Sequence, residues 1–153
     1  MVSVLKIVVT KRTRIERVGS GNTNRASSRV EAHKFSADEV LAVFSKGEAA
    51  AAATLALRAA VEPVLGPHGL AAGIGVHVGP VVEGLYGAQE IKAYDVLGDA
   101  VNTAKRVEGA AAGGEVLLTE AAVALLPRAQ RHGAWRQVTV KGKRLPLRVL
   151  AAA

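Results

Sequence analysis

Residues 73–120 read GIGVHVGPVVEGLYGAQEIKAYDVLGDAVNTAKRVEGAAAGGEVLLTE, and the fold is most readily predicted from this segment. Small and β-branched residues dominate four short runs in and beside it, each typical of a strand: 70–78, 81–86, 93–97 and 115–119. Residues 99–112 instead predict a helix, with Asp99 as its N-cap and Gly113 at its end. Strands interleaved with a helix indicate a domain of the α+β or α/β class.

The sequence on both sides adds elements of the same kinds. On the N-terminal side we expect a strand at 2–10, a loop at 11–29, a hairpin at 30–44 and an Ala-rich helix at 48–65. Asp38 would lie at the tip of that hairpin. On the C-terminal side we expect a short helix at 120–126 and a hairpin made of 137–140 and 145–150.

The composition suits a single folded domain. The chain has 153 residues, half of them hydrophobic, and it contains no cysteine. Disulfides and cysteine-based metal sites are therefore excluded, and a reducing, cytoplasmic location is expected. No membrane span is predicted, because no apolar run reaches about 18 residues.

The positive charge is concentrated near the N-terminus. The net charge is +7, and residues 1–30 hold seven basic side chains against Glu16 alone. The other 123 residues are nearly neutral, with 13 basic and 12 acidic groups. Nucleic acid is therefore not favoured as a partner of the domain as a whole, although a basic arm at 6–29 remains.

Three segments together resemble the catalytic domain of class III adenylyl and guanylyl cyclases. Residues 73–120 resemble that family's GIHxGxVxxG strand followed by YxxxGxxVNxAxRxE. Upstream, 34–44 (KFSADEVLAVF) resembles its K-F-x-G-D-x-V-x-A-x-F hairpin, and downstream 140–143 (VKGK) resembles its terminal hairpin. The motifs occur in family order over about residues 33–150. The resemblance implies a ferredoxin-like α+β sandwich, with a mainly antiparallel sheet and helices packed on one face of it.

Asn102 and Arg106 are the catalytic residues that the resemblance implies. They stand four residues apart and so share one face of the predicted helix. Cyclisation of a nucleoside triphosphate needs the ribose held still and a cation where phosphoryl charge builds up. In the family the Asn holds the ribose and the Arg stabilises the phosphate in the transition state.

Three further residues match the family's substrate-binding positions. Lys34 and Asp95 match the pair that reads the purine, and Lys141 matches a lysine on the triphosphate. A carboxylate accepts from the exocyclic amine of adenine and a lysine donates to a ring nitrogen, so this pair favours ATP over GTP. The alternative is that these three are ordinary solvated charges at strand edges and in a turn.

The metal site is where the sequence departs from the family. The resemblance implies Mg²⁺ or Mn²⁺ held by two aspartates, of which Asp38 matches one. Ala37 replaces the usual glycine before it, and Val8 falls where the other aspartate belongs. We therefore divide the chain into an atypical basic segment, 1–32, and a cyclase homology domain, 33–153. The first segment is either degenerate or foreign to the domain.

Three functional hypotheses follow. The first is an adenylate cyclase that converts ATP to 3′,5′-cyclic AMP and pyrophosphate at a dimer interface. Family sites lie between head-to-tail subunits, so the chain would act as a homodimer or as the substrate-reading half of a heterodimer. The second is a weak or inactive cyclase-like domain that binds nucleotide or a partner cyclase. The third is a module whose basic arm binds nucleic acid or acidic lipid.

Overall fold

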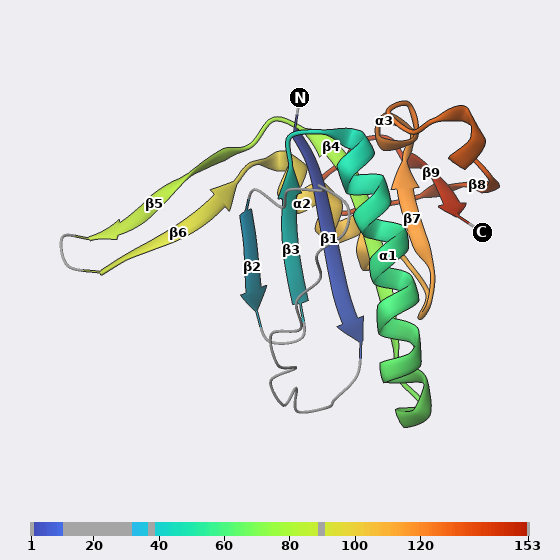
Figure 1. Cartoon of the computed structure of the whole chain (residues 1–153). Coiled ribbons are helices and arrows are strands. Elements are labelled where there is room, and N and C mark those ends of the chain that lie inside the picture. The colour runs from blue at the N-terminus through green and yellow to red at the C-terminus, as the bar shows by residue number, and fades with distance from the viewer. Residues whose placement is uncertain (1, 11–31, 37–38, 89–90, 153) are drawn as a thin grey trace.

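The computed structural model describes residues 2–10, 32–36, 39–88 and 91–152, and Figure 1 shows their arrangement. The elements in chain order are β1 (Val2–Thr10), β2 (Ala32–Ser36), β3 (Glu39–Phe44), α1 (Gly47–Leu65), the 3-10 helix η1 (Gly66–His68), β4 (Ala71–Gly79), β5 (Val82–Ala88), β6 (Ile91–Leu97), α2 (Asp99–Glu108), β7 (Val116–Thr119), α3 (Glu120–Val123), the 3-10 helix η2 (Arg128–Gln130), β8 (Gly133–Val138) and β9 (Leu147–Ala152). Each predicted strand and helix is found near its expected position, except that the strand predicted at 137–140 begins and ends earlier, as β8 at Gly133–Val138.

A seven-stranded sheet forms the centre of the molecule, in the order β2-β3-β1-β4-β7-β9-β8. All neighbouring strands are antiparallel except β4 and β7, which run parallel. This confirms the predicted α+β class with a mainly antiparallel sheet. The strand β1 pairs along its length with β3 on one side and β4 on the other. Strands β5 and β6 form a separate two-stranded ribbon that extends away from the sheet in Figure 1.

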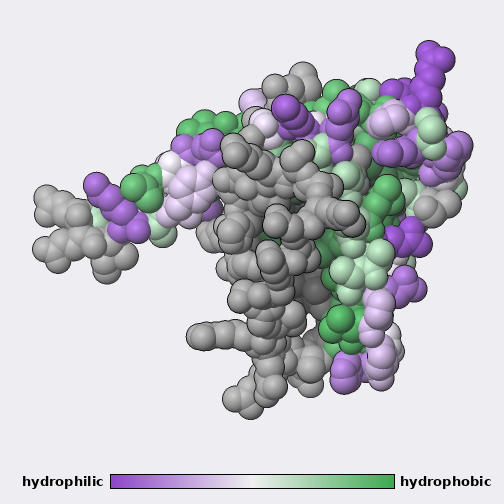
Figure 2. Space-filling model, viewed as in Figure 1, coloured by the Kyte–Doolittle hydropathy of each residue, from purple (hydrophilic) through white to green (hydrophobic). Residues whose placement is uncertain are grey.

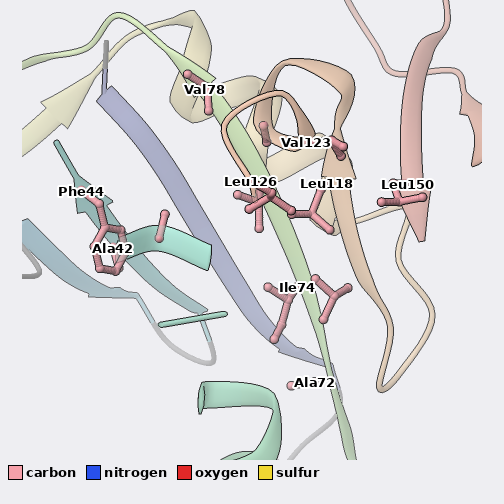
Figure 3. Close-up of a cluster of buried hydrophobic side chains, with 13 residues drawn as sticks. Ala42, Phe44, Ala72, Ile74, Val78, Leu118, Val123, Leu126 and Leu150 are labelled. Atoms are coloured by element: carbon pink, nitrogen blue, oxygen red, sulfur yellow. The ribbon is translucent and has the colours of Figure 1, made fainter. Parts of the chain in front are cut away.

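Hydrophobic side chains cover both faces of the sheet. On one face, Ile74, Leu118 and Leu150 are buried in a cluster that includes Ala50 of α1 and Ala122 of α3 (Figure 3). On the other face, two smaller clusters surround α2, whose buried members include Ala100, Ala104 and Val107. The prediction that the helices share one face is therefore wrong, because alternate residues of the central strands are apolar on both sides and each face needs a cover.

Glycines in β4 allow α2 to lie directly on the sheet. A Cβ placed on Gly75 would lie 2.3 Å from the backbone nitrogen of Glu108 and 2.6 Å from the carbonyl oxygen of Ala104. A Cβ on Gly79 would lie 2.8 Å from the Cβ of Ala100. No larger side chain fits between strand and helix at these positions, so the GxG pattern of β4 fixes how closely α2 approaches.

Within the described part of the chain, one helix is long and apolar enough to cross a membrane, by length and composition alone. It is the segment Gly47–His68, which comprises α1 and η1 and has a mean hydropathy of 1.3. In the structure its Ala50 is buried in the sheet core, and Leu57 and Val61 pack partly buried against the same cluster. Thr54 satisfies its own hydroxyl by donating to the carbonyl oxygen of Ala50 at 2.7 Å. These are the contacts of a helix that covers a sheet.

Both ends of α2 differ from the prediction, and α3 ends at Val123, before the predicted residue 126. The N-cap of α2 is Gly98, and Asp99 is the first helical residue, because the carboxylate of Asp99 takes partners other than the helix N-terminus. The helix ends at Glu108, short of the predicted residue 112. The backbone N–H of Ala112 donates instead to the carboxylate of Glu115 at 2.8 Å, which turns the chain into β7. Tertiary contacts here override the helix propensity of the alanines.

Candidate active site

The candidate site is built on α2 and on the turn between β8 and β9. Arg106 lies half-buried on α2, and its guanidinium rests on Gly142 of the turn. A Cβ placed on Gly142 would lie 3.2 Å from Nη1 of Arg106, and Gly142 has a φ of 81°, which glycine adopts easily. Lys141 precedes Gly142 and is exposed. The structure therefore places Arg106 against the residue that follows Lys141, although 35 positions separate Arg106 and Lys141 in the chain.

An ion pair joins the same turn to the start of α2. The ammonium of Lys143 donates to Oδ2 of Asp99. The Lys143 hydrogen bond is the main reason that the pKa of Asp99 lies below its ordinary value, and Thr103 and Arg106 lower it further. The hydroxyl of Thr103 also donates to Oδ2 of Asp99, at 3.4 Å. Asp99 therefore faces a group of cations contributed by both the helix and the turn.

His77 lies next to this group on β4. Its Nδ1 lies 3.0 Å from Oγ1 of Thr119, the N-cap residue of α3. Burial lowers the pKa of His77 most, and the positive charge of Lys143 lowers it further, while Asp99 raises it. The ring is therefore held in its neutral form near neutral pH.

The other predicted substrate residues surround α2. Asn102 is exposed on α2, one turn before Arg106. Asp95 is half-buried on β6, and its Oδ1 accepts from the backbone N–H of Val96 at 2.9 Å. Lys34 lies on β2, with its backbone opposite Leu41 of β3. Leu41 belongs to a buried cluster that also contains Val96, the residue that follows Asp95 on β6.

The predicted metal site is mostly outside the described residues. Asp38 lies in that undescribed part, and its neighbour Glu39 forms an ion pair with Lys105 of α2 at 3.0 Å. Across the sheet, the backbone of Glu39 pairs with Val8. Within the part of the chain that the structure describes, no three His, Asp or Glu side chains are grouped to hold a metal ion.

Sequence reasoning missed Asp99 and Lys143 as members of this site. The local pattern predicts a helix cap at Asp99 and indicates no role for the second lysine of 140–143 (VKGK). A usable signal existed: two lysines flank a glycine, and a tight turn at glycine places both on one loop. Their pairing with α2 depends on contacts between distant segments, which local patterns do not reveal.

Comparison with known proteins gives one family. The sequence model of the adenylate and guanylate cyclase catalytic domain matches residues 9–150. Among solved structures, the guanylyl cyclase Cya2 matches with a TM-score of 0.72 at 22% identity, covering 99% of this chain and 91% of that chain. The adenylyl cyclase CyaB from P. aeruginosa matches with a TM-score of 0.71 at 18% identity, covering 99% and 93%. The guanylate cyclase domain of RhGC from Catenaria anguillulae, in complex with GTP, matches with a TM-score of 0.69 at 18% identity, covering 99% and 97%.

Proposed function

Because the chain belongs to the family of adenylate and guanylate cyclase catalytic domains, we propose that it converts ATP to 3′,5′-cyclic AMP and pyrophosphate. The observation that carries this proposal is the contact between Arg106 and the turn of residues 141–143. It supports the proposal because the guanidinium lies against a turn that carries two lysines. Such cations suit a triphosphate, whose negative charge must be neutralised while the α-phosphorus reacts.

The reaction needs three tasks from the protein. Asn102 orients the ribose, so that its 3′-oxygen stands in line with the α-phosphorus. The 3′-hydroxyl loses its proton to solvent water, a bond forms from its oxygen to the α-phosphorus, and the bond to the leaving pyrophosphate breaks. Arg106 stabilises the charge that grows on the phosphoryl oxygens, and Lys141 binds the triphosphate. A guanidinium serves here because it offers several N–H donors in a fixed plane.

ATP is the proposed substrate because of Asp95 and Lys34. Solved structures with this fold include both adenylyl and guanylyl cyclases, so specificity rests on these side chains. Asp95 accepts from the exocyclic amine of adenine, whereas guanine presents a carbonyl in that position. Comparing turnover of ATP and GTP tests this directly, and Asp95→Asn should reduce the preference for ATP, because an amide can both donate and accept.

A divalent cation is proposed as the cofactor, Mg²⁺ or Mn²⁺, with Asp38 as its protein ligand. When bound, such an ion neutralises the triphosphate and activates the 3′-hydroxyl. Val8 supplies no carboxylate, and Glu39 is already paired with Lys105. We therefore expect a requirement for high concentrations of Mn²⁺, because fewer carboxylates bind hard cations less tightly.

Dimerisation is part of the proposal, since family sites lie between subunits. The β5–β6 ribbon exposes large apolar side chains, including Leu85 at 67% and Val82 at 65%. These and the exposed Tyr86, Tyr94 and Leu97 follow the ribbon, and Figure 2 shows apolar groups along it. An isolated two-stranded ribbon is only marginally stable in water. A second cyclase domain, identical or different, is the partner that we propose for it.

Cyclic AMP formation by the purified chain in excess Mn²⁺ tests the function. The wild-type chain should produce cyclic AMP, and Asn102→Ala/Arg106→Ala should abolish it. Thermal unfolding of both proteins checks that the double variant folds. Equal turnover in both would contradict the assigned roles.

The second candidate function is a nucleotide-binding regulator without turnover. The observation in its favour is Val8, which has no carboxylate and falls where the resemblance places the other metal-binding aspartate. Saturable ATP binding that Asn102→Ala weakens, with no cyclic AMP at any Mn²⁺ concentration, would select this function. Mixing the chain with an active cyclase domain would then show whether it regulates a partner.

A further inference from the structure

We propose that Lys143 is a further triphosphate-binding residue, which exchanges its partner Asp99 for a phosphate oxygen when the nucleotide binds. This inference rests on the proposed function and deepens it. The proposed site so far uses Arg106 and Lys141. The structure adds Lys143 on the same turn, with its charge directed to the first residue of α2.

The geometry of the turn places the two lysines on either side of Gly142. The backbone N–H of Lys143 donates to the carbonyl oxygen of Val140 at 3.2 Å, which closes a tight turn. Gly142 lies against the guanidinium of Arg106. Both lysines are therefore chain neighbours of the residue that lies against Arg106, and Asp99 interacts with two of the three cations, Lys143 and Arg106.

The Asp99–Lys143 pair is suited to exchange because it is partly exposed. The side chain of Asp99 is 69% exposed and that of Lys143 is 29% exposed. Exposed ion pairs contribute little to stability, since water screens both charges. A triphosphate carries several negative charges and offers lysine a stronger charge-assisted contact than one solvated carboxylate does. The flexible lysine side chain can therefore change partner without a change in the backbone.

Asp99 has a second effect on the same site. It neutralises part of the charge of Arg106 and Lys143 and limits their mutual repulsion. The same negative charge opposes an incoming phosphate. An exchange therefore predicts that removing Asp99 strengthens phosphate binding. A purely structural pair, which fixes the turn on α2, predicts the opposite, because the turn would lose its anchor.

The test uses the whole chain and inorganic tripolyphosphate, with affinity measured by isothermal titration calorimetry at low salt. We expect Lys143→Gln to weaken binding about tenfold, the effect of one charge-assisted contact. Arg148→Gln is the matched control, since it removes the same charge from another exposed ion pair, with Glu120. It should change the affinity less than about twofold.

Asp99→Asn decides between exchange and anchoring. Exchange predicts binding about threefold tighter, and most of that gain should vanish when Lys143→Gln is present in the same chain. Weaker binding in Asp99→Asn, or a loss in Lys143→Gln no larger than in Arg148→Gln, would overturn the proposal. Thermal unfolding of each variant checks that it folds.

Failure of this proposal and failure of the cyclase proposal remain distinguishable. Tripolyphosphate binding needs no turnover, and cyclic AMP formation is measured separately on the same proteins. If no variant makes cyclic AMP while Lys143→Gln still weakens binding, the phosphate role of Lys143 stands and the cyclase activity does not. If wild type makes cyclic AMP and Lys143→Gln binds tripolyphosphate normally, the cyclase activity stands and the phosphate role of Lys143 does not.

Discussion

At the scale of single residues, the site depends on a glycine that carries no functional group. Gly142 has a φ of 81° and lies against the guanidinium of Arg106. We expect Gly142→Ala to lower turnover by about tenfold or more, because the new methyl group displaces Arg106 from the reacting phosphate. The same change should cost about 1–2 kcal/mol of folding stability, since alanine disfavours this backbone conformation. Steady-state assays and urea unfolding measure the two effects.

Gly114 provides the matched control for that substitution. Its φ of 82° is nearly the same, and a Cβ placed on it would meet nothing within 4 Å. Gly114→Ala should therefore lose similar stability and keep its turnover per folded molecule. If both variants lose turnover equally, backbone strain explains the effect and the contact with Arg106 does not.

The identities of the site residues are easier to predict from sequence than the residues that they contact in the folded protein. Asn102 and Arg106 stand at helical spacing within one motif, so their common helix follows from local pattern. The contact of Arg106 with Gly142 and the pairing of Asp99 with Lys143 join segments about 40 residues apart. Such contacts depend on how β9 enters the sheet, and no local pattern contains that information.

At the scale of elements, α2 is held on β4 by a glycine. A Cβ on Gly75 would come within 2.3 Å of the backbone of Glu108, and backbone cannot move aside as a side chain can. We expect Gly75→Ala to destabilise the protein by about 3 kcal/mol, at the upper end of overpacking effects. Gly73→Ala is the comparison on the same face of β4, where the closest atom would lie 3.4 Å away, and it should cost less than about 1 kcal/mol. Equal losses in urea unfolding would show that strand entropy, not helix approach, explains them.

His77 links β4 to α3 and makes stability depend on pH. Its folded pKa lies below the ordinary value of 6.5, because it is partly buried and lies near Lys143. Between the two pKa values the unfolded chain binds a proton that the folded chain does not, so the free energy of unfolding falls as pH drops through this window. Asp99 opposes the effect, and the bond to Thr119 remains available to the neutral ring. Urea unfolding from about pH 8 to about pH 5 should show a smaller pH dependence in His77→Gln than in wild type.

Element types were predictable because hydrophobic periodicity is local, whereas the layer arrangement was not. The strand at 2–10 and the helix at 48–65 match β1 and α1 closely. The prediction of helices on one face failed because both faces of β3 and β4 are apolar: Leu41 and Val43 face α2, while Ala42 and Phe44 face the other side. Strands that are apolar on both faces indicate two covering layers. The apolar residues on both faces are visible in the sequence, but the glycines within 73–79 carry no side chain and so hide the second apolar face of β4.

At the scale of the whole molecule, the N-terminal strand is central. β1 lies between β3 and β4 and pairs with both, so the sheet would be interrupted without it. Val8 and Glu39 are opposite each other in that pairing. The division of the chain at residues 32 and 33 stays a prediction about its origin. The pairing shows that β1, which lies within 1–32, is a central strand of the sheet.

The β5–β6 ribbon should determine the oligomeric state. Leu85 is 67% exposed on the ribbon, and Leu85→Lys should convert a dimer to monomer at micromolar concentration, because it buries a charge at the centre of the apolar contact. Val64→Lys is the control, since Val64 is also exposed, at 57%, but lies on α1. Sedimentation velocity measures both. A wild-type chain that is already monomeric would show that its partner is a different cyclase domain, or that the ribbon has another role.

A site shared between two copies makes a quantitative prediction about mixtures. If one copy supplies Asp38 and the other supplies Asn102 and Arg106, then Asp38→Asn and Asn102→Ala should each be inactive alone. In a two-fold dimer that joins one of each, one site combines both substitutions and the other combines neither. Equal mixing of subunits gives about half mixed dimers, so cyclic AMP formation should recover to about a quarter of the wild-type rate. Leu85→Lys, introduced into both partners, should abolish the recovery without touching either site. If the mixture stays inactive although sedimentation shows mixed dimers, each site lies within a single chain and the head-to-tail arrangement is wrong for this protein.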